Sequence, residues 1–227
     1  MDQMIRLNKR LVELGLADSR RKADAMISDQ RVSVNGANVD DLGIKVSEAD
    51  EILVDGKQGT AKSDIYIVYN KPRGQVCSHV GQGAVTIFDK LPKSFSSLKI
   101  AGRLDKDSEG LVILSSDGNF VNQLSHPSHN KEKTYIVKTK QPIDAPDIAK
   151  LNGGIKLEDG ISKMNVKSID SQTVRIIMSE GKNRQIRRTL ASIGKDVIKL
   201  SRIKINGYAR PNLAVGEYEF IRPGDVL

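Results

Sequence analysis

The stretch AGRLDKDSEGLVILSSDG, residues 101–118, joins a charged loop directly to a run of aliphatic residues. An arginine, followed by three acids within five positions, comes before Gly110, and the aliphatic run Leu-Val-Ile-Leu follows it. A short uninterrupted apolar run beside polar turn residues is typical of a buried strand. The stretch therefore predicts a charged loop whose base is fixed by a buried strand.

The three acids of this loop are Asp105, Asp107 and Glu109, and the residues alone admit several roles for them. They could form a solvated turn. Asp105 and Glu109 could act as the acid and the nucleophile of a glycosidase, although the sequence does not fix their separation. All three could bind a metal ion, although the glycine and spacing pattern of a calcium loop is missing. No local feature decides among these alternatives.

Strand signals dominate the chain beyond residue 64. Apolar runs bounded by Gly, Pro, Asn or Asp predict strands in IYIVYN (65–70), LVILSS (111–116), TYIVKTK (134–140), SKMNVKSI (162–169), TVRIIMSE (173–180), DVIKLSRIKI (196–205) and YEFIRP (218–223). Helices are predicted in GNFVNQLS (118–125), APDIAKLN (145–152) and NRQIRRTLASIG (183–194). This pattern predicts an α+β domain with a mainly antiparallel, mixed sheet.

A smaller module precedes this domain. Two short amphipathic helices are predicted between Arg6 and Ser28, the second beginning at Asp18 or Ser19. RVSVNG (31–36) and EILVDG (51–56) predict strands, and Asn-Gly indicates a tight hairpin turn. We therefore expect a module at 1–57, a polar linker at 58–64 and a second domain at 65–227.

The positive charge of the chain lies in the second domain. The 227 residues carry a net charge of +8, which divides into −2 over residues 1–60 and +10 over residues 61–227. Residues 181–204 contain eight lysines and arginines and a single acid, Asp196. Such a basic surface suits a polyanionic partner, because lysine and arginine can neutralise phosphates.

Other classes of protein fit the sequence less well. The single Cys77 can form no internal disulfide and rules out a metal site built of several cysteines, so we expect a small buried residue in a reducing compartment. No window is long and apolar enough for a membrane span, and the N-terminus lacks the apolar stretch of a secretory signal. We therefore expect a cytoplasmic protein, and we take it to be a monomer.

The segment RLNKRLVELGLADSRRKADAMISDQRVSVNG (6–36) resembles the RNA-binding module named after ribosomal small-subunit protein four. In that module two short helices and a strand-turn present basic side chains to RNA. The resemblance implies RNA contacts from Arg6, Lys9, Arg10, Arg20, Arg21 and Lys22.

The charged loop belongs to a second resemblance. GRLDKDSEGLVILSSDG looks like the catalytic motif of RNA pseudouridine synthases of the ribosomal RNA branch usually called the RsuA/RluB family. Further stretches match in the expected order: NKPRGQVCS (70–78), KTYIV (133–137), EGKNRQIRRTLASIG (180–194) and KLSRIKI (199–205). Together with the N-terminal module, the resemblance covers nearly the whole chain.

The family's functional residues can be carried over by position. Asp105 matches the catalytic aspartate, and Arg103 matches the arginine that enters the base stack as the uridine leaves it. Tyr135 matches the tyrosine that stacks on the extruded base and is a candidate for proton removal. Arg187 matches the arginine that pairs with the aspartate and keeps it ionised, and Leu200 matches an apolar wall of the pocket. Asp107 and Glu109 then become exposed acids of the loop.

The resemblance also implies the partner and the class of reaction. Uridine in ribosomal RNA is isomerised to pseudouridine without a cofactor or a metal, and the target base is flipped out of the helix. Further contacts to RNA phosphates are expected from Lys71, Arg73, Lys182, Arg184 and Arg188. The rival hypothesis is a non-catalytic RNA-binding assembly factor built from the same modules. The sequence leaves open the ribosomal subunit that is modified and the choice between a covalent adduct and a glycal route.

Overall fold

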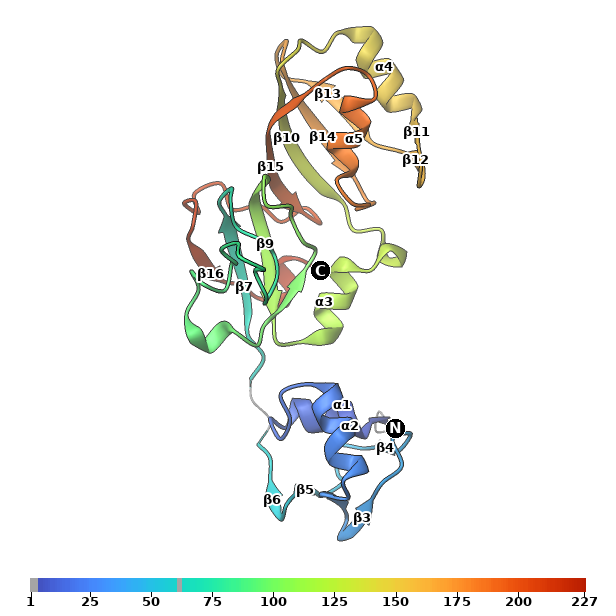
Figure 1. Ribbon diagram of the computed structural model, residues 1–227, viewed down its shortest axis with the longest axis vertical. Coiled ribbons are helices and arrows are strands. Elements are labelled where there is room, and N and C mark those ends of the chain that lie inside the picture. Colours follow the sequence, from blue (N-terminus) through green and yellow to red (C-terminus); the bar gives the residue numbers. More distant parts are fainter. Residues whose placement is uncertain (1–3, 61–62) are drawn as a thin grey trace. The chain divides into compact units, whose positions relative to one another are not determined.

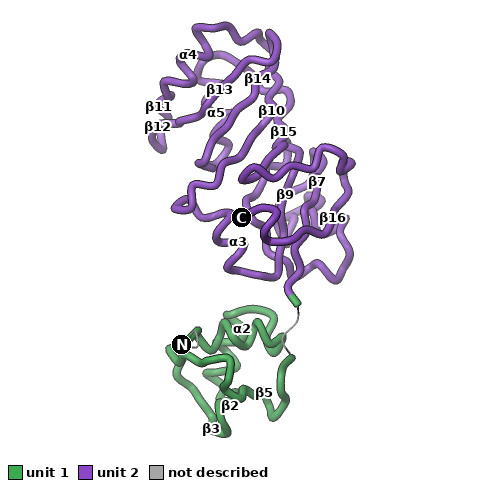
Figure 2. Tube along the Cα trace, turned by 180° about the vertical axis from the view of Figure 1, so that it is seen from behind, with its two compact units in different colours: residues 1–63 green, residues 64–227 purple. Residues whose placement is uncertain are grey.

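A computed structural model describes residues 4–60 and 63–227. The chain divides into two compact units, Met1–Ser63 and Asp64–Leu227, which Figure 2 colours green and purple. Each unit has its own buried apolar cluster. The units are described separately below.

The first unit packs two helices against short strands (Figure 1). The helices are α1 (Leu7–Glu13) and α2 (Arg20–Ser28), so the prediction of two short helices is confirmed. Ser19 begins α2, and its hydroxyl accepts a hydrogen bond from the backbone N–H of Lys22 (3.3 Å), as expected of an N-cap. The apolar faces of both helices supply Leu7, Leu11, Ala23 and Ile27 to the core of the unit.

Among residues 4–60, four strands form the sheet of this unit in the order β3-β2-β5-β6. Their bounds are β2 (Val32–Val34), β3 (Ala37–Val39), β5 (Ile52–Val54) and β6 (Lys57–Gln58), and a separate pair joins β1 (Ile5–Arg6) to β4 (Lys45–Val46). Asn35 and Gly36 turn β2 into β3 with φ of 49° and 81°. This turn confirms the hairpin predicted from Asn-Gly, which tolerates the left-handed backbone at both positions.

The linker predicted at 58–64 begins too early. Gln58 is paired with Leu53 in the sheet. Gly59 is packed so closely that a Cβ there would lie 2.5 Å from the carbonyl oxygen of Leu14. The first unit therefore extends beyond residue 57, and residues 61–62 of the predicted linker lie outside the described residues.

Within residues 63–227, eight strands form one large sheet (Figure 1). The order β13-β14-β10-β15-β9-β7-β16 runs across it, and β8 also pairs with β9. The strands are β7 (Tyr66–Lys71), β8 (Lys99–Ala101), β9 (Glu109–Ser115), β10 (Lys133–Thr139), β13 (Asn165–Ser168), β14 (Thr173–Met178), β15 (Val197–Ile205) and β16 (Tyr218–Phe220), with a separate hairpin of β11 (Ile155–Leu157) and β12 (Gly160–Ser162). These strands confirm the seven segments predicted from the sequence and the α+β fold class.

The sheet contains a seam where β9 meets β15. This pairing is parallel, whereas the other pairings of the sheet among the described residues are antiparallel. At the seam Gly110 lies beside Arg202 with φ of +109°, and a Cβ on Gly110 would lie 2.3 Å from the carbonyl oxygen of Arg202. Only glycine fits this approach of two backbones. The charged loop predicted from residues 101–118 ends at this seam.

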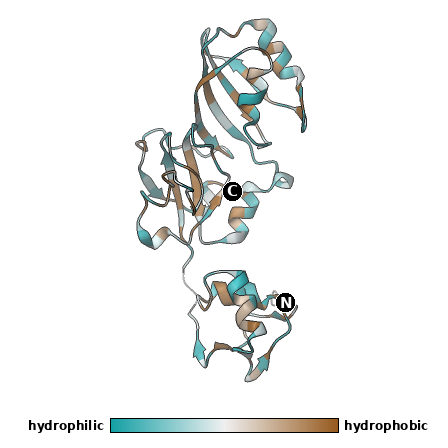
Figure 3. Ribbon diagram, viewed as in Figure 1, coloured by the Kyte–Doolittle hydropathy of each residue, from teal (hydrophilic) through white to brown (hydrophobic). Residues whose placement is uncertain are grey.

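The aliphatic run after Gly110 is buried on both faces of the sheet. Val112 and Leu114 belong to the larger apolar cluster, whereas Leu111 and Ile113 belong to a second cluster on the other face, with Phe120. Figure 3 shows the apolar colour concentrated on the strands around β9. Burial on both faces explains why the run is continuous rather than alternating.

Three α-helices complete the second unit and confirm the predicted helical segments: α3 (Gly118–Ser125), α4 (Ala145–Gly153) and α5 (Gln185–Ala191). Three short 3-10 helices lie within residues 63–227, at Lys93–Phe95, Pro127–His129 and Pro223–Asp225. Asp117 caps α3 by accepting hydrogen bonds from the next residues of the helix, and Asp144 and Asp147 form a reciprocal capping box at α4. Among the described residues, none of the helices has the length and apolar character needed to cross a membrane.

Candidate active site

A cavity of about 860 Å³ lies beside the seam of the large sheet. The loop between β8 and β9 borders it, and β10, α5 and β15 supply other parts of its wall. The residues that the family resemblance assigned to catalysis and to the pocket all line this cavity: Arg103, Asp105, Tyr135, Arg187 and Leu200. They come from positions up to about a hundred residues apart, and the fold brings them together.

The loop that carries Asp105 is held at both ends by Arg202. This arginine is 2% exposed, and its guanidinium donates to the carbonyl oxygens of Gly102 (2.8 Å) and Leu111 (2.7 Å). These two carbonyls bracket the segment that contains the predicted nucleophile. A planar guanidinium with several fixed donors is suited to such a double contact. Arg202 lies in the motif KLSRIKI, but its role was not predicted from the sequence.

Lys71 corrects the predicted RNA surface. It is fully buried at the end of β7, opposite Gly110 of β9, and its ammonium donates to the carbonyl oxygens of Ser108 (2.7 Å) and Pro72 (2.9 Å). Burial lowers the pKa of this ammonium. Lys71 is therefore not available at the surface for RNA, and it instead supports the loop of Asp105 from inside the protein.

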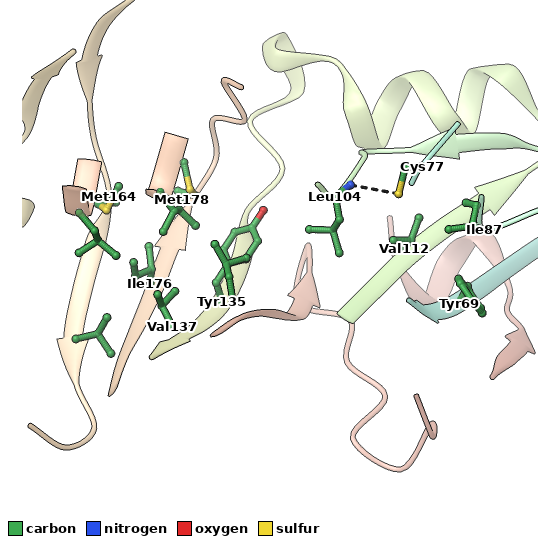
Figure 4. Packing of buried hydrophobic residues seen from close by; sticks show 14 of the residues in the cluster. Tyr69, Cys77, Ile87, Leu104, Val112, Tyr135, Val137, Met164, Ile176 and Met178 are labelled. Carbon is green, nitrogen blue, oxygen red and sulfur yellow. Dashed lines mark hydrogen bonds between the residues drawn. The ribbon is translucent and has the colours of Figure 1, made fainter. Parts of the chain in front are cut away.

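Cys77 is buried, as predicted, and it also contacts the loop. Its sulfur accepts a hydrogen bond of 3.4 Å from the backbone N–H of Leu104, which directly precedes Asp105 (Figure 4). Burial raises the pKa of the thiol. Cys77 is thus a packed side chain that helps to fix the position of the loop.

The arginine nearest to the carboxylate of Asp105 is not the predicted one. A guanidinium nitrogen of Arg184 lies 3.7 Å from Asp105 Oδ2. Arg187, for which this pairing was predicted, instead has Nε 3.2 Å from Asp107 Oδ2 and donates from Nη2 to the carbonyl oxygen of Asp107 (2.9 Å). Arg187 also donates to the hydroxyl of Ser108 (3.3 Å). It donates as well to the carbonyl oxygen of Val197 on β15 (3.3 Å), so its contacts join β15 to the residues that follow Asp105 in the loop.

Asp107 and Glu109 are not the exposed acids that were predicted. Asp107 accepts two hydrogen bonds from Arg184 (2.9 and 3.0 Å), and the guanidinium lowers the pKa of this carboxyl. Glu109 lies 2.9 Å from the ammonium of Lys199 and accepts from the hydroxyl of Ser201 (2.6 Å). Burial of Glu109 opposes ionisation, but these two contacts outweigh it and the pKa is lowered.

Arg184 has an unusual backbone. It precedes α5 in the left-handed conformation, with φ of 47° and ψ of 30°. A residue other than glycine in this region costs of order 1 kcal/mol, and such costs are found where surrounding contacts hold the backbone in place. The two hydrogen bonds from the Arg184 guanidinium to the carboxylate of Asp107 are such a contact.

Tyr135 and Leu200 form the apolar part of the wall. Tyr135 is 7% exposed and pairs in the sheet with Ile176 on one side and Arg202 on the other. In Figure 4 the ring of Tyr135 lies between the side chains of Met178 and Leu104. Leu200 is buried in the same apolar cluster and also borders the cavity, so its structural role and its predicted place in the wall occur together.

The remaining basic residues predicted to bind RNA near this site are at least partly accessible. Arg73 is exposed and, with Lys106 and Arg184, lines a shallow recess of about 440 Å³. Lys182 forms an ion pair with Glu180 (3.3 Å), and Arg188 forms a two-point contact with Asp159 (2.7 and 3.0 Å). RNA binding would have to compete with these acids for Lys182 and Arg188.

The basic residues of the first unit that were predicted to bind RNA also include both unpaired cations and cations paired with acids. Arg6, Arg20 and Arg21 are exposed and have no ion pair among the described residues. Lys9 and Arg10 both pair with Glu13 (3.6 and 3.5 Å), and Lys22 pairs with Asp18 (2.5 Å). The three exposed arginines are therefore the most available cations of the predicted set.

One further cation of the cavity was not predicted. Lys133 lies two positions before Tyr135 on β10, lines the cavity and donates to the carbonyl oxygen of Ser179 (3.1 Å). Burial lowers the pKa of its ammonium. The only hint of this role in the sequence was the place of Lys133 in the motif KTYIV.

In the described part of the chain, no group of three or more His, Cys, Asp or Glu side chains is arranged to hold a metal ion.

Comparisons with known proteins agree with this geometry. The RNA pseudouridylate synthase family matches residues 65–192, and the S4 domain matches residues 5–52. The chain is 36% identical, over 98% of its length, to the ribosomal large subunit pseudouridine synthase B of Bacillus subtilis (strain 168), of which it covers 94%. It is also 36% identical, over 91% of its length, to the protein of that name from Xanthomonas campestris pv. campestris, of which it covers 45%.

A solved structure is similar over both units. The crystal structure of a pseudouridylate synthase superimposes with a TM-score of 0.71 at 32% sequence identity, and the match covers 97% of each chain. The matched family spans more than half of this chain, including the loop of Asp105, β10 and α5. The chain therefore belongs to the RNA pseudouridine synthases, a family of isomerases, and carries an S4 domain at its N-terminus.

Proposed function

We propose that this pseudouridine synthase modifies a uridine of large-subunit ribosomal RNA, with Asp105 as the nucleophile and Tyr135 as the platform for the extruded base. The observation that carries the proposal is that Arg103, Asp105 and Tyr135 line the same cavity. The names of the relatives from Bacillus subtilis and Xanthomonas campestris support the large subunit as the source of the substrate. A ribosomal RNA substrate would also fit the cytoplasmic location expected from the sequence.

The reaction requires a nucleophile more than a cofactor. The bond between ribose C1′ and uracil N1 breaks, the ring turns, and a bond forms between C1′ and C5. C5 then loses its hydrogen as a proton and N1 takes up a proton, so that the product is an isomer of uridine. A carboxylate can divide this change into easier steps by covalent catalysis. Asp105 is only partly exposed, and its loop is held by Arg202, Lys71 and Cys77, so the carboxylate enters the reaction already oriented.

Access to the target requires base flipping, since the glycosidic bond of a stacked uridine is hidden. Arg103 is exposed at the rim of the cavity, where its planar guanidinium can fill the space that the base leaves. Inside the cavity, Tyr135 offers an aromatic face, and stacking on such a face contributes about 1–3 kcal/mol per base. Arg73 and Arg184 beside the cavity suit contacts to neighbouring phosphates.

Tyr135→Phe tests whether the hydroxyl takes part in proton removal. The substitution keeps the stacking face, so RNA affinity should stay within about threefold of the wild-type value. If the hydroxyl moves a proton, kcat should fall by about 10²-fold or more. Single-turnover rates and RNA binding are the measurements. An unchanged rate would leave Tyr135 with stacking alone.

Deletion of residues 1–60 tests the role of the S4 unit. The deletion removes Arg6, Arg20 and Arg21 but leaves every residue of the cavity. If the unit acts as a second, tethered contact, KM for ribosomal RNA should rise by about 10-fold or more while kcat is largely kept. Binding should also depend less steeply on salt, because fewer counterions are released. An equal loss of kcat at saturating RNA, in a truncated protein shown to be folded, would contradict the tether.

Mapping of pseudouridines in cells that lack this protein tests the proposed substrate. We expect one or a few pseudouridines to disappear from large-subunit ribosomal RNA and to return when the wild-type chain is restored. Loss from small-subunit RNA would keep the activity but overturn the assignment of the subunit. An unchanged map of both RNAs would favour the rival, a non-catalytic assembly factor that uses the same RNA-binding modules.

A further inference from the structure

One carboxylate, that of Asp107, contacts both Arg184 and Arg187. We propose that Asp107 is a positioning residue, which holds Arg184 and Arg187 in place beside Asp105 and so fixes the cationic wall next to the nucleophile. This inference rests on the proposed function, because it concerns how the nucleophile of that reaction is oriented.

The contacts of Asp107 come from two directions. Arg184 donates from both terminal nitrogens, one to each carboxylate oxygen, at 3.0 and 2.9 Å. Arg187 forms an ion pair with the same carboxylate, with Nε 3.2 Å from Oδ2, although this nitrogen makes no hydrogen bond to any described residue. It also donates to the backbone carbonyl of Asp107 at 2.9 Å. Asp107 Oδ2 therefore lies between two guanidinium groups, and its charge offsets their mutual repulsion.

Arg184 links Asp107 to the nucleophile. The Arg184 guanidinium, which binds Asp107, also has Nη1 3.7 Å from Asp105 Oδ2. One planar group therefore faces two carboxylates. A two-point fork fixes the plane of a guanidinium, which a single contact does not. The side chain of Arg184 is 44% exposed, so it depends on such a fork for a defined position.

Asp107 itself is placed to orient rather than to react. It borders the shallow recess with Arg73, Lys106 and Arg184, and it is not among the described residues that line the larger cavity with Tyr135. The hydrogen bond from Arg184 lowers the pKa of Asp107, in keeping with a carboxylate that stays charged. Glu109, two positions further on, pairs instead with Lys199 and Ser201 and also does not line the cavity. The same motif thus offers a matched control.

The test compares Asp107→Asn with Glu109→Gln and Asp107→Glu. Asparagine keeps the shape but loses the charge, so kcat should fall about 10- to 100-fold while KM for RNA stays within about threefold, as expected of misplaced groups. Glu109→Gln should keep kcat within about twofold of wild type, because neither Glu109 nor its partners Lys199 and Ser201 line the cavity. Asp107→Glu restores the charge and should recover at least half of the lost kcat on a logarithmic scale. Thermal unfolding should show Asp107→Asn and Glu109→Gln to be equally well folded.

A second readout does not depend on turnover. Nitrogen relaxation of the arginine Nε–H groups should show restricted motion for Arg184 and Arg187 in the wild-type protein and in Glu109→Gln. Arg184 should become more mobile in Asp107→Asn, whereas Arg187 should change less, because its guanidinium also donates to the backbone carbonyl oxygens of Asp107 and Val197. Unchanged motion in Asp107→Asn, or increased motion with an unchanged kcat, would overturn the inference. A wild-type protein without isomerase activity on any ribosomal RNA would contradict the proposed function instead, while the relaxation data would still decide whether Asp107 positions the arginines.

Discussion

Asp105→Asn should abolish turnover while leaving the protein folded and bound to RNA. Asparagine has nearly the same shape as aspartate but carries no charge with which to attack the uridine. Loss of a nucleophile of this kind lowers kcat by about 10⁴-fold or more. RNA affinity should stay within about threefold, because we assign it mainly to phosphate contacts made by other residues. Single-turnover rates and filter binding on the same RNA measure the two effects.

Glu109→Gln is the matched control for this experiment. It neutralises an acid of the same loop that contacts Lys199 rather than the cavity, so its rate should resemble that of the wild type. A rate for Asp105→Asn close to that of the control would remove Asp105 from the role of nucleophile. A large loss of RNA binding would instead show that Asp105 contributes to holding the substrate.

Gly110→Ala should destabilise the second unit more than an ordinary glycine substitution does. Its φ of +109° disfavours any side chain, and a Cβ would lie 2.3 Å from the oxygen and 2.6 Å from the nitrogen of the Arg202 backbone. The backbone strain costs about 1–3 kcal/mol and the overpacking a similar amount, so the free energy of unfolding should fall by about 2–6 kcal/mol. Because the displaced backbone belongs to the arginine that brackets the catalytic loop, kcat should fall as well.

Gly160 provides the comparison, since it has the same φ of +109° but its Cβ would meet only the flexible end of Lys182 at 3.3 Å. Gly160→Ala should therefore show the conformational cost without the clash. Chemical unfolding of both variants separates the two contributions. Equal destabilisation would mean that β9 and β15 can move apart at little cost, contrary to the close parallel seam described here.

Local patterns predicted the secondary structure well because the strands obey simple rules of burial. The run after Gly110, the Asn35-Gly36 turn and the Ser19 cap could each be recognised from a few neighbouring residues. The family motif chose residues that the fold brings to one cavity, including Asp105 and Tyr135. Several short strands were not predicted, because two or three residues carry no usable periodicity: β1, β4, β6, β8, β11 and β12.

The errors at the site concern charged residues whose partners are remote in sequence. Asp107 meets Arg184 across 77 residues, and Glu109 meets Ser201 across 92. A local window shows the charge of each residue but not the partner, so a solvated acid was the natural expectation. Lys71 was misjudged for the same reason, since only the fold places its ammonium against the carbonyl oxygen of Ser108. Long-range partners decide which charges of this chain face RNA and which hold the loop.

The most direct test of the account is tritium release from ribosomal RNA labelled at C5 of uridine, because isomerisation frees that hydrogen and binding alone does not. We predict that the wild-type protein releases tritium from large-subunit RNA to a stoichiometry of about one uridine per molecule, if a single site is modified. Asp105→Asn should release none above background under the same conditions. Release by Asp105→Asn at the wild-type rate, or no release by the wild-type protein from either ribosomal RNA, would contradict the account.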